Sequence, residues 1–134
     1  MKRTTLLAVV ILVFSFFLAA TTMAFPPLPE DLNIVQPDPS LPKELAAFSG
    51  KWEGKAGSRE FFLIVEKIDQ EKATLRLPSG YGWETMPAHV VKEYGKWKIW
   101  FIGRRGVNEL SLRGKGKYLD VHVPNATATL TRVH

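Results

Sequence analysis

The feature that most restricts the fold is a series of short apolar or alternating runs that begins at Gly50 and continues to the end of the chain. From Leu119 to Val123, for example, apolar residues alternate with polar ones. A period of two is the pattern of a β-strand with one buried face and one solvated face. The chain contains eight such runs, which predict strands at residues 50–56, 60–68, 72–78, 85–93, 96–102, 107–113, 117–123 and 126–133.

The links between these runs are short and contain turn residues, as in Gly114-Lys115-Gly116 and Pro124-Asn125. Links of this length join neighbouring antiparallel strands. An open meander would leave two unpaired edges, and closing the sheet removes both of them. The sequence therefore predicts an all-β, eight-stranded antiparallel up-and-down (meander) barrel. A sandwich of two sheets built from the same strands is the alternative.

The N-terminal segment predicts where the protein works. A basic start precedes an apolar run at residues 6–18, and the small residues of Thr22-Met23-Ala24 follow. This is the layout of a secretory signal peptide, and the run is shorter than the roughly 20 residues of a spanning helix. We expect residues 1–24 to be removed, so that a mature protein beginning at Phe25 is exported, either periplasmic or secreted. An uncleaved anchor is the alternative.

Residues 25–41 form a second segment, which is rich in proline. Proline fixes φ and removes a backbone donor, so this segment is predicted to be an extended arm. Pro42 is well placed in the first turn of a helix and Gly50 is able to end it, which predicts one or two helical turns between them. Residues 42–134 then form one small barrel domain.

Composition limits the chemistry. The chain has no cysteine, which excludes disulfides, thiolate metal ligands and thiol nucleophiles, so the domain must rely on packing. The formal net charge is +5, and because residues 25–46 are acidic, the domain that follows is basic. A basic surface attracts anionic sugars, phosphate, nucleic acid or acidic protein, although the same charge can serve solubility alone. No strong nucleic-acid signal accompanies it.

Two short features lie at the ends of the predicted barrel. Gly50-Lys51-Trp52 opens the first strand just after the helical turn, and Arg132 lies on the last strand. This arrangement resembles the calycin superfamily, which includes the lipocalins and the avidins. There a Gly-x-Trp opens the first strand, and an arginine or lysine of the last strand packs across the indole. The resemblance implies that Trp52 and Arg132 meet at a closed floor of the barrel, with Gly50 as part of the signature.

The resemblance is to a minimal barrel of this type. The chain has no second lipocalin motif, no C-terminal helix and no disulfide. It also resembles bacterial metalloprotease inhibitors, which are small eight-stranded barrels whose extended N-terminal arm enters the protease. The cysteine pair of that family is absent from this chain.

In a meander, alternate links lie at the same end, so the residues of each end can be sorted from the sequence. The first, third, fifth and seventh links bring together cations, two aromatic residues and glycine-rich loops. Aromatic rings stack on sugars or other rings, and paired arginine donors hold carboxylate or phosphate. Two adjacent arginines between Gly103 and Gly106 can equally be plain turn residues. The candidate ligand-binding residues are Lys55, Arg59, Tyr81, Trp83, Arg104 and Arg105.

The fifth predicted strand places Trp97, Ile99 and Phe101 on one face, opposite Lys98 and Trp100. The charge of Lys98 indicates that the first three residues point inward. Trp97 is then either a core residue or the wall of a pocket. Trp100 is predicted to be exposed or to lie under the arm.

No pattern indicates catalysis. The three histidines lack metal-ligand spacing, and no serine stands in a recognisable nucleophile setting, although Asp120 and His122 are close enough in sequence to pair. Glu60 and Glu66 flank an apolar strand and are interpreted as surface charges. We therefore predict a protein that is not an enzyme, with no catalytic residue, cofactor or metal. Asn125-Ala126-Thr127 has the form of a glycosylation acceptor, which matters only in a eukaryotic host.

Two functional hypotheses remain. The first is an exported binding protein that takes a small anionic or ring-bearing ligand at one rim of the barrel. The second is a protein-interaction module, such as a protease inhibitor, that acts through its N-terminal arm. The partner is thus a small molecule or a protein, and no membrane anchor is expected after signal cleavage.

Overall fold

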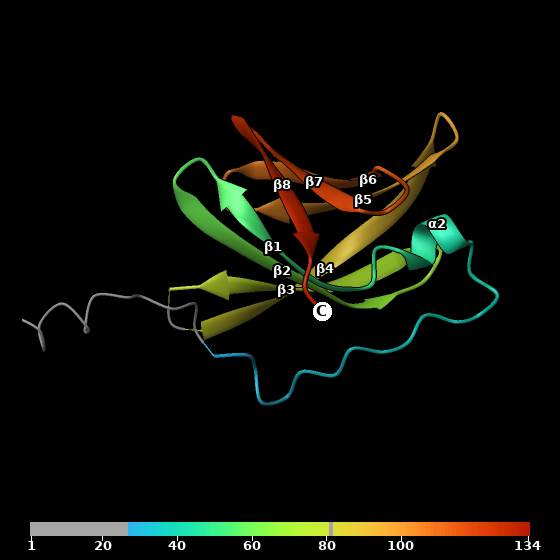
Figure 1. Ribbon diagram of the computed structural model, residues 1–134, viewed down its shortest axis with the longest axis horizontal. Helices are drawn as coiled ribbons and strands as arrows, with labels where there is room; N and C mark the ends of the chain where they lie inside the picture. Colours follow the sequence, from blue (N-terminus) through green and yellow to red (C-terminus); the bar gives the residue numbers. More distant parts are fainter. Residues whose placement is uncertain (1–26, 81) are drawn as a thin grey trace, which may run out of the picture.

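The computed structural model describes residues 27–80 and 82–134. Eight strands follow one short helix, and they pair antiparallel in chain order, with β8 returning to β1 to close a barrel (Figure 1). The closure excludes the sandwich and confirms the predicted meander barrel. The elements are α2 (Lys43–Ala46), β1 (Gly50–Ala56), β2 (Arg59–Ile68), β3 (Lys72–Ser79), β4 (Gly82–Glu93), β5 (Lys96–Gly103), β6 (Gly106–Arg113), β7 (Tyr118–Val123) and β8 (Ala126–Arg132).

The strand boundaries follow the alternation of the sequence closely. The largest difference is at β4, which begins at Gly82 rather than at residue 85. The glycine-rich composition before it predicts a loop, but pairing with β3 continues to the Ser79–Gly82 pair. Among the described residues, no helix is long and apolar enough to cross a membrane.

One contiguous core occupies the inside of the barrel. Alternate residues of each strand point inward, and the members from β2, β5 and β7 include Leu63, Ile99 and Val121, all buried. Phe101 is buried with them, as predicted. The interior is thus packed with side chains, and a ligand is expected to bind near an end of the barrel.

The predicted contact between Trp52 and Arg132 is present. The two residues are paired across β1 and β8, and the Arg132 guanidinium lies 4.3 Å from the centre of the Trp52 ring. The indole is fully buried, and its Nε1 donates to the Phe48 carbonyl oxygen at 2.9 Å. Arg132 also donates to the carbonyl oxygens of Ala47 and Ser49. The first strand, the last strand and the turn after α2 are therefore joined at one point.

Gly50 leaves room for this contact. Its φ is +115°, a value that other residues rarely adopt. A Cβ atom at this position would also lie 3.0 Å from Nη1 of Arg132. The Gly-x-Trp pattern therefore has a steric reason in this chain.

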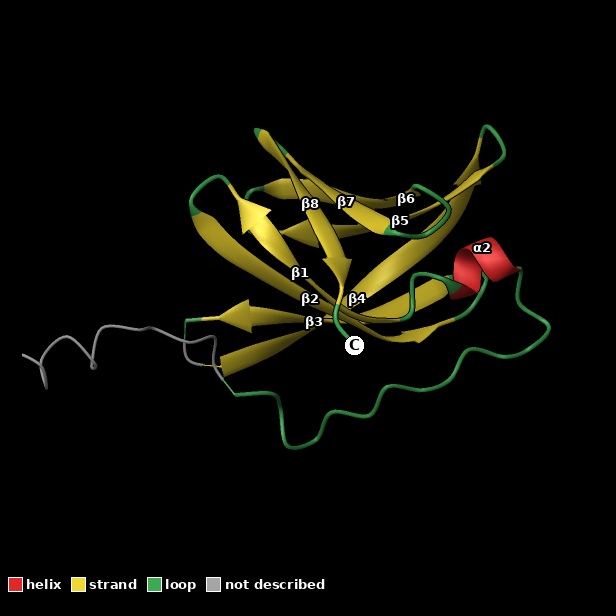
Figure 2. Cartoon of the chain, viewed as in Figure 1, coloured by secondary structure: helices red, strands yellow, loops and turns green. Residues whose placement is uncertain are grey.

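The proline-rich arm lies against the outside of the barrel. Backbone N–H groups of Asn33 and Val35 donate to the side chain and the carbonyl oxygen of Glu66, at 3.1 and 2.8 Å. Phe62 and Ile64 alternate with the inward residues of β2 and so face outward, yet they are only 8% and 0% exposed. The arm is hydrogen-bonded to Glu66 on this same strand, and Trp83 joins Pro27 to the Phe62 ring, so we infer that the arm covers both side chains. Figure 2 shows it running along the barrel as a loop, from the β3–β4 link to α2.

Glu66 holds the arm through an ionic network. A β-bulge between Val65 and Lys67 interrupts the pairing of β2 with β3 at this residue. Arg76 Nε lies 2.6 Å from Glu66 Oε2, and Arg76 Nη2 lies 3.1 Å from an Asp31 carboxylate oxygen. Hydrogen bonding to Arg76 is the main cause that lowers the pKa of both carboxyl groups. The interpretation of Glu66 as a surface charge is therefore wrong, because the bulge and the arm enclose it.

Candidate ligand-binding sites at the two ends of the barrel

The barrel has two chemically different ends. The β1–β2, β3–β4, β5–β6 and β7–β8 links lie at one end, on the left of Figure 1, which we call the arginine end. The three remaining links and α2 lie at the other, which we call the helix end. The buried pair of Trp52 and Arg132 belongs to the helix end, beside the turn that follows α2.

The sequence-predicted ligand residues lie at the arginine end. Lys55, Arg59, Arg104 and Arg105 are exposed there, and none of them forms an ion pair within the described part of the chain. Tyr81 lies outside the described residues. The four cations are spread over two different hairpins, so they form a basic rim rather than one cluster.

Trp83, the remaining predicted residue, already has partners. Its Nε1 donates to the Pro27 carbonyl oxygen at 2.7 Å, and its ring meets the Phe62 ring edge-on with centroids 5.6 Å apart. The indole therefore holds the start of the arm against β2. A ligand contact through Trp83 stays a prediction, and it would have to use the part of the ring that these partners leave exposed.

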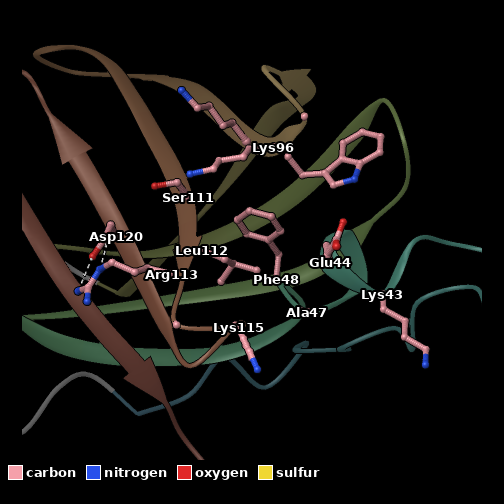
Figure 3. A pocket seen from close by; sticks show the side chains of 15 residues that line it. Lys43, Glu44, Ala47, Phe48, Lys96, Ser111, Leu112, Arg113, Lys115 and Asp120 are labelled. Atoms are coloured by element: carbon pink, nitrogen blue, oxygen red, sulfur yellow. Dashed lines mark hydrogen bonds and ion pairs between the residues drawn. The ribbon is translucent and has the colours of Figure 1, made fainter.

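A groove of about 820 Å³ is found at the helix end, where the sequence did not predict a site. Figure 3 shows Phe48 and Leu112 in its middle, with Lys43 and Glu44 of α2 on one side and Arg113 and Asp120 on the other. The remaining lining residues come from the β4–β5 and β6–β7 hairpins and the residue after α2; they are Ala47, Gly95, Lys96, Trp97, Lys98, Ser111, Gly114, Lys115 and Gly116.

The cations of the groove fall into two groups. Lys98 Nζ lies 2.9 Å from Glu109, and Arg113 Nε lies 3.0 Å from Asp120, so both charges are already paired. The other three have no ion-pair partner among the residues that the structure describes, and all are exposed; they are Lys43, Lys96 and Lys115. In the described part of the chain, these lysines are not held by a carboxylate; Glu44 also lines the groove, and Figure 3 shows the Lys43 side chain directed away from Phe48.

Trp97 supplies the aromatic surface of the groove. It is half-buried, and Lys92 Nζ lies 5.3 Å from the centre of its ring. Both interpretations that the sequence allows apply, because Trp97 packs against the core cluster and also lines the groove. Trp100, on the outer face, stacks on His89 with ring centroids 4.3 Å apart, so its predicted exposure is only partial.

The polar residues of β6–β8 form a set of hydrogen bonds with one another. His122 contacts the Thr127 hydroxyl at 3.1 Å and the Ser111 hydroxyl at 3.4 Å. Asp120, which the sequence suggested as its partner, instead accepts from Arg113 and Thr129. Among the described residues, no carboxylate is hydrogen-bonded to this imidazole as in a nucleophilic triad. Within residues 27–80 and 82–134, no group of three potential ligands for a metal ion is present.

The sequence could not reveal the groove because its lining comes from three separated segments. Residues 43–48, 95–98 and 111–120 meet only when the barrel closes and α2 folds against it. Each segment has an ordinary surface composition, and the spacing of the lysines within it matches no motif. The one feature of the sequence that could have indicated the groove is the position of Trp97 at the start of β5, next to the β4–β5 link.

Comparisons with known proteins do not assign a function. No protein-family model matches the chain, and no curated protein or solved structure matches it significantly. The interpretation therefore rests on the geometry described above.

Proposed function

We propose that the chain is an exported, non-enzymatic binding protein with a calycin-like barrel, and that it takes a small anionic ligand in the groove at the helix end. The groove carries the proposal, because it combines a concave shape, a half-buried tryptophan and three unpaired lysines. The arrangement of Gly50, Trp52 and Arg132 supports the calycin-like part of the proposal.

The chemistry of the lining suggests the class of ligand. Lysine ammonium groups at the rim attract carboxylate, sulfonate or phosphate, and Trp97 with Leu112 offers apolar surface for a ring or a short hydrocarbon. The volume of the groove lies within the range of small-molecule sites. A compound with one anionic group and one aromatic or apolar part satisfies both features.

The inhibitor hypothesis is the weaker one. An arm that enters a protease must be free to leave the barrel, whereas residues 27–35 are held by Trp83, Arg76 and Glu66. Their release would expose Phe62 and Ile64 to water. The basic rim at the arginine end remains the competing location for a small ligand.

A fluorescent anion with an aromatic part tests the location. The probe 8-anilinonaphthalene-1-sulfonate should bind the mature protein, and the double change Lys96→Glu with Lys115→Glu should weaken its Kd at least tenfold. Hydrogen bonds to charged groups contribute about 1.5–3 kcal/mol each, and about 1.4 kcal/mol corresponds to a factor of ten. Fluorescence titration at constant ionic strength measures the effect.

The matched control makes the same change of charge at the other end. Arg104→Glu with Arg105→Glu should leave the probe's Kd within a factor of two, because these residues are outside the groove. If the arginine variant weakens binding of the probe and the lysine variant does not, the probe binds at the arginine end. If neither double variant alters binding, the groove proposal is wrong.

Export has its own test. The protein recovered from the exported fraction should begin at Phe25, because Thr22 and Ala24 are the small residues at the cleavage positions. N-terminal sequencing or intact mass measurement checks this. Full-length chain retained in a membrane fraction would show that the segment acts as an anchor.

A further inference from the structure

The β5–β6 hairpin ends in an exposed tip that combines apolar and basic side chains. Ile102 and Val107 are paired across the two strands and are 66% and 59% exposed. Arg104 and Arg105 form the link between them and have no ion-pair partner in the described part of the chain. Two mostly exposed aliphatic side chains beside two guanidinium groups are unusual at a hairpin tip.

The same chemistry extends over the arginine end. Lys55 and Arg59 add two exposed cations, and Leu28, next to the Pro27 that Trp83 holds, is a further exposed apolar residue. Glu60 is the cross-strand neighbour of Lys55, and Glu84 lies near the start of β4, so the basic excess of this end is concentrated in Arg104 and Arg105 at the hairpin tip. The end is therefore both basic and partly apolar.

We propose that the arginine end docks on an anionic lipid surface. Guanidinium groups match the phosphates of the headgroups, and the aliphatic side chains of the tip reach the boundary of the acyl chains. The position of the arm supports a membrane as the partner. In the precursor, only residues 19–26 separate the apolar run from Pro27, which is fixed at this same end. A barrel that folds before the apolar run is removed would therefore hold this end nearest to the membrane.

The binding should be weak and reversible. Each basic residue near an anionic leaflet strengthens binding by about fivefold, and two aliphatic side chains add a small apolar contribution. The interaction should therefore depend steeply on the fraction of anionic lipid and on ionic strength. This proposal does not depend on a ligand in the groove at the helix end.

Vesicle sedimentation with the mature protein tests the proposal. Vesicles of phosphatidylcholine and phosphatidylglycerol in equal amounts should bind the protein at 50 mM NaCl, and vesicles of phosphatidylcholine alone should not. Arg104→Glu with Arg105→Glu should lower the partition coefficient more than tenfold. Ile102→Ser with Val107→Ser keeps the charges and should lower it severalfold. Both variants should keep the wild-type melting temperature, since the four substituted side chains are mostly exposed.

The control variant Lys96→Glu with Lys115→Glu reverses two charges at the helix end and should bind vesicles nearly as well as the wild type. An equal loss in this variant would overturn the proposal, and so would absence of wild-type binding. If soluble polyglutamate displaces the vesicles and the serine variant binds unchanged, the tip recognises an acidic protein rather than lipid. Titration with the anilinonaphthalene probe on the same variants reports separately on the groove.

Discussion

Replacing Trp52 with alanine should lower the free energy of unfolding by about 3–5 kcal/mol, the usual range for deleting a large buried aromatic residue. The indole is fully buried and contacts both the Arg132 guanidinium and the Phe48 carbonyl oxygen. Its removal leaves a cavity where the first and last strands meet. Denaturant unfolding followed by circular dichroism measures the loss. Trp100→Ala is the matched control and should be much milder, since Trp100 lies on the outer face and is partly exposed.

Arg132→Ala should destabilise the barrel less than Trp52→Ala does. The arginine loses its position over the indole and its hydrogen bonds to Ala47 and Ser49, but it leaves a smaller cavity. In the double variant the two losses should not add, because the side chains share one contact. Additive losses would show that the stacked geometry contributes nothing to stability.

The barrel could be predicted because its information is local. Period-two alternation sets the inward face of each strand, and short links leave antiparallel neighbours as the only arrangement. The contact of Trp52 with Arg132 was predicted on a resemblance, and the structure adds its physical reason at Gly50. The strands depend on residues whose roles follow from their immediate neighbours in the chain, whereas the contact of Trp52 with Arg132 joins the first strand to the last.

The functional surfaces could not be predicted in the same way, since they depend on segments that meet only in the folded chain. Glu66 follows an apolar run and so has the sequence context of a surface charge, and only the bulge in β2 shows that it holds the arm. The groove needs α2 and two hairpins at once. Sorting the links by end correctly placed the cations of the basic rim together at the arginine end. It carried no information on where the surface is concave. The ligand site was therefore predicted at the arginine end, whereas the groove lies at the helix end.

Deleting residues 25–39 should destabilise the mature protein by about 3 kcal/mol. The arm covers Phe62 and Ile64, and exposing a buried side chain of this size costs about 1.5–3 kcal/mol. The arm loses conformational entropy when it is ordered, and this loss offsets part of the stabilisation that it provides. Its prolines reduce the entropy that is lost. Urea unfolding of the mature protein with and without residues 25–39 measures the difference in stability. An unchanged midpoint would show that the arm buries no side chain that stabilises the barrel.

A second substitution separates covering by the arm from other effects of the deletion. Ile64→Ala should destabilise the full mature protein by about 2–5 kcal/mol, as expected for a buried isoleucine. In the arm-deleted protein the same change should matter little, because surface substitutions usually stay within about 0.5 kcal/mol. Leu63→Ala, on the inward face of the same strand, should cost the same in both backgrounds. Equal effects of Ile64→Ala in both would mean that something other than the arm buries it.

Acid should weaken the attachment of the arm. The pKa of Glu66 and that of Asp31 lie below their ordinary values of 4.5 and 3.8, chiefly because Arg76 donates hydrogen bonds to them. A carboxyl group whose pKa is lowered by folding stabilises the fold above its unfolded pKa, and the stabilisation is lost as the pH falls through the folded value. The full mature protein should therefore lose stability below about pH 4.5. The arm-deleted protein lacks Asp31 and the Asn33 donor, so its loss over the same range should be smaller, and parallel losses would exclude an arm that is held by these groups.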